Sequence, residues 1–135
     1  MIVVDASVLI AHLDERDALH ERAVEALLEW ADQPLTCSQM TLAEVLVAPA
    51  RHGRLDAAQD AIARLGVGEL PFAADAAPRL ASLRAATNLN LPDCCVLLAA
   101  EDAPAGRILT FDDRLGRAAA DHGLEVLNAG PSEKP

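Results

Sequence analysis

Aromatic residues are the scarcest class in this sequence, at only 2% of its 135 positions. Tyrosine is absent, and the large rings are those of Trp30, Phe72 and Phe111. Proteins that bind single-stranded nucleic acids by stacking bases need several exposed rings. This composition therefore argues against a base-stacking surface, whereas its small and aliphatic apolar residues suit packed helices and buried strands.

Long hydrophobic runs are also missing. No apolar stretch approaches the roughly 20 residues that span a bilayer. The first segment, MIVVDASVLIAHLDE, has no charged region ahead of its apolar residues and meets Asp5 early, unlike a secretory signal. We therefore expect a cytoplasmic protein that makes no use of a membrane.

Cysteine is scarce and irregularly spaced. The three cysteines are Cys37, Cys94 and Cys95, an odd number with two adjacent, and no Cys-x-x-Cys or histidine-rich spacing accompanies them. Neither a disulfide framework nor a zinc site is indicated. We expect three small, buried thiols in a reducing compartment.

Positive charge is in short supply, since the formal net charge is −10 and Lys134 is the only lysine. This is the wrong sign for a nucleic-acid partner, because phosphate contacts need clustered basic residues. An acidic total can still hide a local basic face, and arginine suits two-pronged phosphate contacts better than lysine does.

The sequence does contain a regular alternation of short apolar runs and amphipathic stretches. The β-branched run Ile2-Val3-Val4 is typical of a strand buried on both faces in a parallel sheet. The same reasoning predicts strands at 2–4, 35–37, 67–72 (an edge strand because of Pro71), 108–111 and 126–127. It predicts helices at 7–13, 18–31, from Ser38 or Thr41 with a weak point at Pro49 and an end by Gly53, 55–65, 75–86, 93–101 and 113–122.

This alternation predicts an α/β sandwich with a mainly parallel sheet. We expect a single domain over residues 1–130 and a flexible tail over 131–135. In such sheets, chemistry gathers beyond the carboxyl ends of the strands, where the strand order switches.

Four acidic residues lie at the junctions of the predicted elements. Asp5 and Asp112 follow strands, whereas Glu44 and Asp93 lie near the starts of helices, so all four could meet at one edge of the sheet. Carboxylates that lie close together raise each other's pKa, and their hard oxygens suit Mg²⁺ or Mn²⁺. Such ions assist the hydrolysis of phosphodiesters.

Each acid also has a purely structural explanation. Asp5 could cap the helix that follows it, and Thr41-Leu42-Ala43-Glu44 matches a capping box. Asp93 follows Pro92, as at many helix starts. Either Asp112 or Asp113 could cap the last helix, and the sequence does not separate the two.

The segments IVVDASVLIAHL, TLAEVLVAPARHGRL, LPDCCVLLAAE and ILTFDDRLGRAA, in this order, resemble the PIN-domain ribonucleases, and most closely the VapC toxins of bacterial toxin–antitoxin pairs. The resemblance implies a PIN-like three-layer sandwich whose five strands have the order 3-2-1-4-5, with helices on both faces. It implies that Mg²⁺ or Mn²⁺ ions are bound by Asp5, Glu44, Asp93 and Asp112, which form the catalytic site. It also implies a homodimer, an endonuclease that acts on structured RNA, and inhibition by a small VapB-type antitoxin.

Other polar residues near these acids are candidates for supporting roles. Ser7 and Thr110 stand beside two of the acids and could orient a ligand or a water, and Asp113 adjoins Asp112. We hypothesise a local basic rim for RNA, made by Arg51, His52, Arg54, Arg114 and Arg117. None of the histidines, His12, His20, His52 and His122, adjoins a candidate acid, so we interpret them as surface or core residues.

Three competing functions are compatible with parts of the pattern. A phosphoacceptor receiver domain would need an acid at the end of the third strand and a late lysine, but 67–72 ends without an acid. A haloacid-dehalogenase-type phosphatase would need an acid two residues after its nucleophile, where this chain has Ser7. A non-catalytic PIN-like protein that binds RNA or a partner is compatible with all of the residues.

Overall fold

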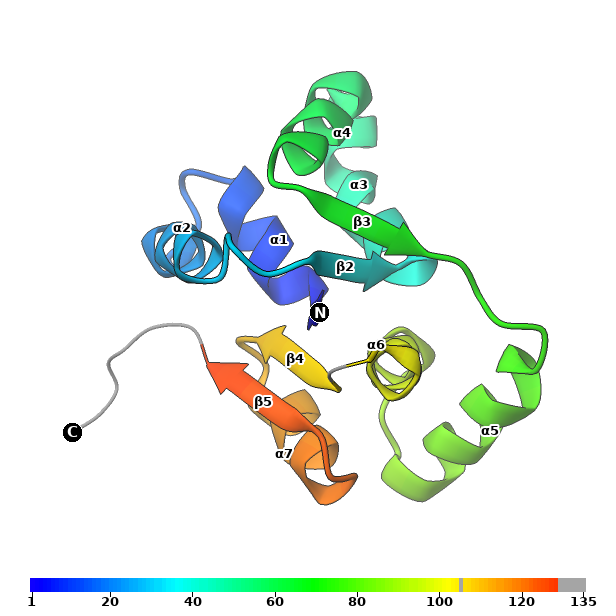
Figure 1. Ribbon diagram of the computed structural model, residues 1–135. Coiled ribbons are helices and arrows are strands. Elements are labelled where there is room, and N and C mark those ends of the chain that lie inside the picture. The colour runs from blue at the N-terminus through cyan, green and yellow to red at the C-terminus, as the bar shows by residue number, and fades with distance from the viewer. Residues whose placement is uncertain (105, 129–135) are drawn as a thin grey trace.

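The computed structural model describes residues 1–104 and 106–128, so the predicted tail at 131–135 lies outside the described residues. Parallel strands form one sheet in the order β3-β2-β1-β4-β5 (Figure 1). They are β1 (Ile2–Val4), β2 (Leu35–Ser38), β3 (Val67–Leu70), β4 (Arg107–Thr110) and β5 (Glu125–Asn128). The α/β class is confirmed, as is the strand order that the resemblance implies.

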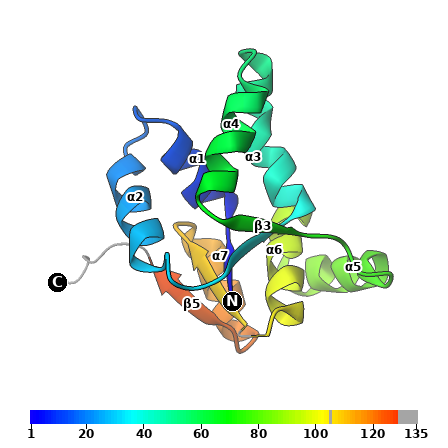
Figure 2. The same cartoon turned by 45° about the horizontal axis from the view of Figure 1, so that its top comes forward.

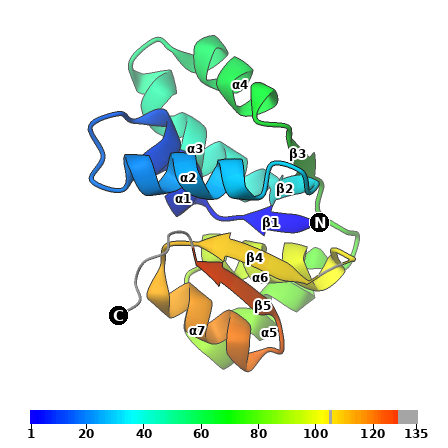
Figure 3. The same cartoon turned by 60° about the vertical axis from the view of Figure 1, so that its left-hand side comes forward.

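Helices cover both faces of this sheet, which gives the three expected layers (Figure 3). One face carries α1 (Ala6–Leu13), α2 (His20–Glu29), α3 (Gln39–Arg51) and α4 (Leu55–Arg64). The other carries α5 (Ala76–Thr87), α6 (Leu91–Asp102) and α7 (Asp113–Asp121). Within the described ranges, we find no helix that is both long and apolar enough to cross a membrane.

The central strand explains the opening apolar run of the sequence. Ile2 and Val4 pack with the helices of one face, whereas Val3 packs with those of the other, and all three are fully buried. Side chains alternate between the faces of a strand, so a strand with a helix layer on each side must be apolar throughout. Helix α6 is buried along Cys94–Ala100, and the three cysteines are buried and free, as expected.

The strand order switches beside β1. The chain passes from β1 to β2 and β3 on one side and later to β4 and β5 on the other. Val4 pairs with Leu109, and the Asp5 N–H donates to the Leu109 carbonyl at 3.0 Å. The chain therefore leaves β1 and β4 at neighbouring points on the carboxyl edge, where open α/β sheets bind ligands.

Helices α3 and α4 project from the body of the molecule as a pair joined near Gly53 (Figure 2). The helix ends before Gly53, as expected, but it is not interrupted at the expected weak point, because α3 continues through Pro49 to Arg51. Pro49 lies in the last turn, where its carbonyl accepts from the Arg54 N–H at 2.8 Å, so the end of the helix keeps its hydrogen bonds. Strand β3 ends at Leu70 rather than at residue 72, because its partner β2 ends at Ser38.

Ser38 caps the start of α3, and its substitution tests how much this cap stabilises the fold. Its buried hydroxyl accepts from the Thr41 N–H at 3.0 Å and donates to the Thr41 hydroxyl at 3.1 Å. Ser38→Ala removes both bonds and leaves buried polar groups unpaired, so we expect the free energy of unfolding to fall by about 1–2 kcal/mol. Chemical denaturation measures this. Ser82→Ala, at an exposed position of α5, is the control, and equal stabilities of the two variants would contradict this role for Ser38.

Candidate active site

Asp5 is the most deeply buried of the candidate acids, with 5% of its surface exposed. Its Oδ2 accepts a hydrogen bond from the Ser7 hydroxyl at 2.7 Å and another from the Thr110 hydroxyl at 2.8 Å. Asp5 stands at the N-cap position of α1, as expected, but its side chain makes no capping bond, so capping does not explain the carboxylate. A buried carboxylate held through one oxygen can present the other oxygen to a ligand.

The two hydroxyls that hold Asp5 also fix the chain that leaves β4. The Ser7 oxygen accepts from the Phe111 N–H at 3.1 Å, and the Thr110 oxygen accepts from the Asp112 N–H at 2.9 Å. Each hydroxyl thus donates to Asp5 while accepting from the backbone beyond β4. This arrangement links the ends of β1 and β4 to a single carboxylate.

Asp112 caps helix α7. Its Oδ1 accepts from the Leu115 N–H at 3.1 Å, whereas Asp113 is exposed and is the first residue of the helix. This resolves the ambiguity between the two aspartates, because Asp112 is the cap. A carboxylate has two oxygens with several acceptor sites, so capping leaves Asp112 able to bind a cation as well.

The capping-box explanation for Glu44 is wrong, whereas the helix-start explanation for Asp93 is confirmed, because Asp93 follows Pro92 in the first turn of α6. Helix α3 is capped by Ser38, so Thr41 lies inside the helix and Glu44 belongs to no capping box. Helix α6 is capped by Asn90, whose side chain accepts from the Asp93 N–H at 2.9 Å. Neither carboxylate therefore acts as the cap of its helix.

These acids, Asp5, Glu44, Asp93 and Asp112, are called the acidic quartet from here on, because they act on one another electrostatically. Burial, and then the charges of the other three members, raises the pKa of Asp93 to about 6, against a smaller opposing effect of Arg114. Burial and the charge of Asp5 raise the pKa of Glu44. Four segments that are distant in the sequence thus bring negative charge to one place.

The donor chemistry of the acidic quartet fits a divalent cation. Hard carboxylate oxygens suit Mg²⁺ and Mn²⁺, and a bound cation would offset the repulsion that raises the pKa of Asp93. Within residues 1–104 and 106–128, no three His, Cys, Asp or Glu side chains already lie close enough to hold a metal ion. Glu44 is exposed, so its side chain has the most freedom to turn towards the other acids.

The candidate RNA-binding residues lie in two separate places. Arg114 and Arg117 are exposed on α7, and Arg114 is near enough to Asp93 to lower its pKa. Arg51, His52 and Arg54 lie at the far end of the α3–α4 pair. The structure therefore brings Arg114 to the acidic quartet but does not gather the five residues into one patch.

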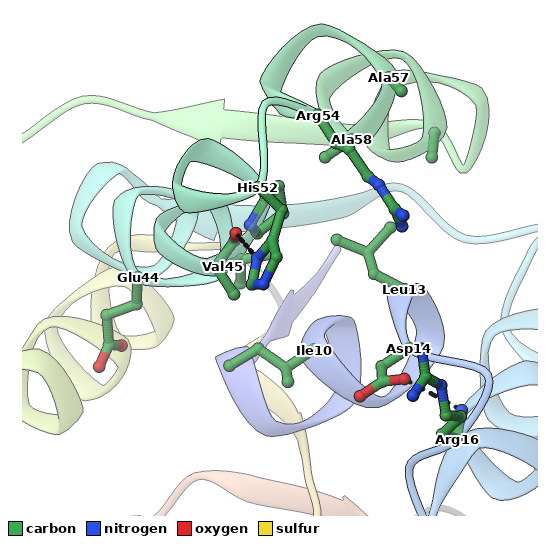
Figure 4. A pocket seen from close by; sticks show the side chains of 13 residues that line it. Ile10, Leu13, Asp14, Arg16, Glu44, Val45, His52, Arg54, Ala57 and Ala58 are labelled. Atoms are coloured by element: carbon green, nitrogen blue, oxygen red, sulfur yellow. Dashed lines mark hydrogen bonds between the residues drawn. The ribbon is translucent and has the colours of Figure 1, made fainter.

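A groove of about 490 Å³ runs between α1, α3 and α4 (Figure 4). It is lined by apolar residues that include Ile10, Val45 and Ala58, and Glu44 lies at one end of it, away from Arg54. Ile10 keeps 43% of its surface exposed. The groove therefore leads from an apolar surface to one member of the acidic quartet.

Sequence reasoning missed one side chain near this site. The guanidinium of Arg22, on α2, lies over the ring of Phe111, 5.1 Å from its centroid. Phe111 stands directly before Asp112 in the chain, so this arginine contacts the neighbour of one member of the acidic quartet. The sequence offers no signal for the pairing, because 88 intervening residues separate the two.

A model of the PIN domain family matches residues 2–121, which is most of the chain. This chain therefore belongs to the PIN domain family, and the family resemblance is confirmed. The assignment also replaces the receiver-domain and haloacid-dehalogenase alternatives. No sequence among the curated proteins matches the chain closely enough to add to this.

Solved structures share the fold at low sequence identity. A toxin–antitoxin complex from Klebsiella pneumoniae is 22% identical at a TM-score of 0.71, over 86% of this chain and 90% of that chain. VapC20 of Mycobacterium tuberculosis, a toxin that cleaves the sarcin–ricin loop, is 22% identical at a TM-score of 0.70, and the match covers 87% of this chain and 95% of that chain. VapBC2 of Rickettsia felis, bound to a fragment of its promoter DNA, is 15% identical at a TM-score of 0.71, and the match covers 96% of this chain and 99% of that chain. At these identities the likeness shows the fold alone.

The raised pKa of Asp93 predicts how stability depends on pH. Its pKa is about 6 in the folded protein against 3.8 for the isolated group, so the stabilisation from its tighter proton binding is present below pH 3.8 and is lost as the pH rises through about 6. We expect metal-free Asp93→Asn to be more stable than the wild type at neutral pH, by about 1–2 kcal/mol.

Urea unfolding in EDTA, repeated from about pH 4 to about pH 8, measures this difference. The advantage of the variant should shrink towards the acid end of the series. Asp60→Asn, at an exposed position of α4, is the control and should change little. A metal-free Asp93→Asn protein that is less stable than the wild type at neutral pH would show that the charge of Asp93 is not destabilising.

Proposed function

We propose that this protein is a metal-dependent endoribonuclease that acts as the toxin of a toxin–antitoxin pair. The observation that carries the proposal is the position of Asp5 and Asp112 at the ends of β1 and β4, together with the raised pKa of Asp93, which is caused by burial and then by the charges of Asp5, Asp112 and Glu44. Membership of the PIN domain family and the fold shared with toxin structures support it. The proposed cofactor is Mg²⁺ or Mn²⁺, held by the acidic quartet.

The chain's own residues would divide the work of this site. When bound, the cation supplies Lewis-acid stabilisation for the charge that develops on a phosphodiester during hydrolysis. Asp5, held by Ser7 and Thr110 through Oδ2, would offer Oδ1 as a fixed ligand. Glu44, Asp93 and Asp112 would complete the ligand set, and Ser7 and Thr110 would act by positioning Asp5 rather than by touching RNA.

Asp113 would have a secondary role in this scheme. It is exposed in the first turn of α7, directly after Asp112, so it is available to solvent and to hydrated ligands. Direct contact with the cation is not required of it, because the acidic quartet already provides four carboxylates.

The proposed partners follow from the same assignment. RNA is the substrate, a VapB-type antitoxin the inhibitor, and a second copy of the chain the partner in a homodimer. The structural neighbours include complexes of toxins with antitoxins, which supports the antitoxin. The groove between α1, α3 and α4 is a suitable place for an apolar antitoxin segment, because it ends at Glu44 and a bound segment would restrict access to the acidic quartet.

The first test is cleavage of total cellular RNA by the purified, partner-free protein, with 5′ ends mapped. We expect discrete cuts with Mg²⁺ or Mn²⁺ and none with EDTA. Asp5→Asn and Asp93→Asn should each lower cleavage by about 100-fold or more, because each removes a charged ligand. Asp60→Asn, on the exposed face of α4, should cleave like the wild type.

The outcomes of this test separate the alternatives. A folded, metal-loaded wild type that cuts no RNA would contradict the nuclease proposal and favour the non-catalytic, binding function. Cuts that survive both Asp5→Asn and Asp93→Asn would show that the acidic quartet is not the catalytic site.

A second test concerns the proposed basic rim. Replacing Arg51, His52, Arg54, Arg114 and Arg117 together with alanine should raise KM for RNA about tenfold or more and flatten its dependence on salt, because phosphate contacts release counterions. Cleavage assays over a series of salt concentrations measure both effects. Unchanged cleavage with unchanged salt dependence would show that these five residues do not form an RNA-binding surface. The single variants should show the largest effect for Arg114, because it is the one of these five residues whose charge acts on Asp93.

A further inference from the structure

Each aspartate of the acidic quartet is held in a different way. Asp5 is fixed by the Ser7 and Thr110 hydroxyls, and Asp112 is fixed because its own carboxylate caps α7. Among the residues that the structure describes, Asp93 is bonded through its backbone N–H, and no hydrogen bond or ion pair holds its side chain. The position of the Asp93 carboxylate therefore depends on the backbone at the start of α6.

The first turn of α6 lies outside the buried part of this helix. Burial runs from Cys94 to Ala100, whereas Leu91 keeps 49% of its surface exposed and both Pro92 and Asp93 are half-buried. Packing against the core therefore secures the helix from Cys94 onwards, but not the turn that carries Asp93. Such a terminal turn frays unless its free N–H groups find acceptors.

Asn90 supplies the acceptors for this turn. Its side-chain oxygen accepts from the Asp93 N–H at 2.9 Å, and its carbonyl accepts from the Cys94 N–H at 3.0 Å. Pro92 has no N–H that needs a partner. The capping bond of α6 therefore ends on the residue that carries the carboxylate.

The connection from α5 holds Asn90 in turn. The Thr87 hydroxyl accepts from the Leu89 N–H at 3.1 Å and donates to the Leu83 carbonyl at 2.7 Å. The Leu89 carbonyl accepts from the Arg84 guanidinium at 2.6 Å, and Leu89 itself is buried. Asn90 thus follows a residue whose backbone is bonded through both its N–H and its carbonyl, so the cap starts from a fixed point.

We propose that Asn90 is a positioning residue, which places the Asp93 carboxylate for the divalent cation by bonding the Asp93 N–H. The inference rests on the proposed metal-dependent function and adds a residue that acts through Asp93 and touches neither the cation nor the RNA. With its backbone fixed and its side chain half-buried, Asp93 has few rotamers open to it. Less conformational freedom is then lost when the cation binds, which favours binding.

The test measures Mn²⁺ binding in the absence of RNA. The electron paramagnetic resonance signal of free Mn²⁺ is followed as partner-free protein is added, well below the thermal midpoint of every variant. Asn90→Ala should weaken Mn²⁺ binding about tenfold, because the first turn of α6 frays and the carboxylate loses its fixed position. Asn90→Ser keeps a capping oxygen, so its affinity should stay within about twofold of the wild type.

Two further comparisons separate positioning from stability. Ile62→Val alters the core on the opposite face of the sheet from α6, so it should lower the thermal midpoint and leave Mn²⁺ binding unchanged. Asn90→Ala added to Asp93→Asn should cause little further loss of Mn²⁺ affinity, because no carboxylate remains at that position to be placed.

The outcomes distinguish this inference from the proposed function. An Asn90→Ala protein that loses thermal stability but binds Mn²⁺ like the wild type overturns the inference, because Asn90 is then a structural cap only. An equal loss of affinity with and without the Asp93 carboxylate overturns it too. A wild type that binds no Mn²⁺ contradicts both this inference and the proposed cofactor. A wild type whose Mn²⁺ binding depends on Asn90 but which cuts no RNA contradicts the nuclease proposal and leaves the positioning role supported.

Discussion

Two hydrogen bonds to one oxygen of Asp5 organise the carboxyl edge of this sheet. Ser7 and Thr110 both donate to Oδ2, and both also accept from the backbone that leaves β4. A buried carboxylate without such donors would be strongly disfavoured. The hydroxyls thus provide hydrogen bonds for a carboxyl group that is buried at this edge, and they join the two strands between which the strand order switches.

The remaining acids stand around this centre with little compensating positive charge. The pKa of Asp93 is raised to about 6 because burial and three other carboxylates act on it, while Arg114 opposes them only in part. We expect such an arrangement to lower the stability of the metal-free protein, against the stabilisation that comes from the buried helix α6 and the fully buried strand β1. A site with this imbalance is better suited to binding a cation than to holding the fold together.

Local sequence rules explain the acids only in part. The capping interpretation was correct for Asp112 alone, because Ser38 and Asn90 cap the helices that Glu44 and Asp93 occupy. The capping-box motif at Thr41 failed because Thr41 is buried one turn inside α3, a fact that depends on where β2 ends. Pro49 was expected to weaken α3, but it lies in the last turn, where later backbone groups complete the hydrogen bonds.

The sequence by itself determined the alternation of helices and strands, the burial of β1 and α6, and which acids stand at the ends of elements, because these follow from local hydrophobic periodicity. The tertiary structure alone decided that Ser7 and Thr110 share one oxygen of Asp5, that Arg114 reaches Asp93, and that Arg22 lies over Phe111. The physical reason is that these contacts join segments far apart in the chain, and their geometry depends on how layers pack rather than on any local pattern.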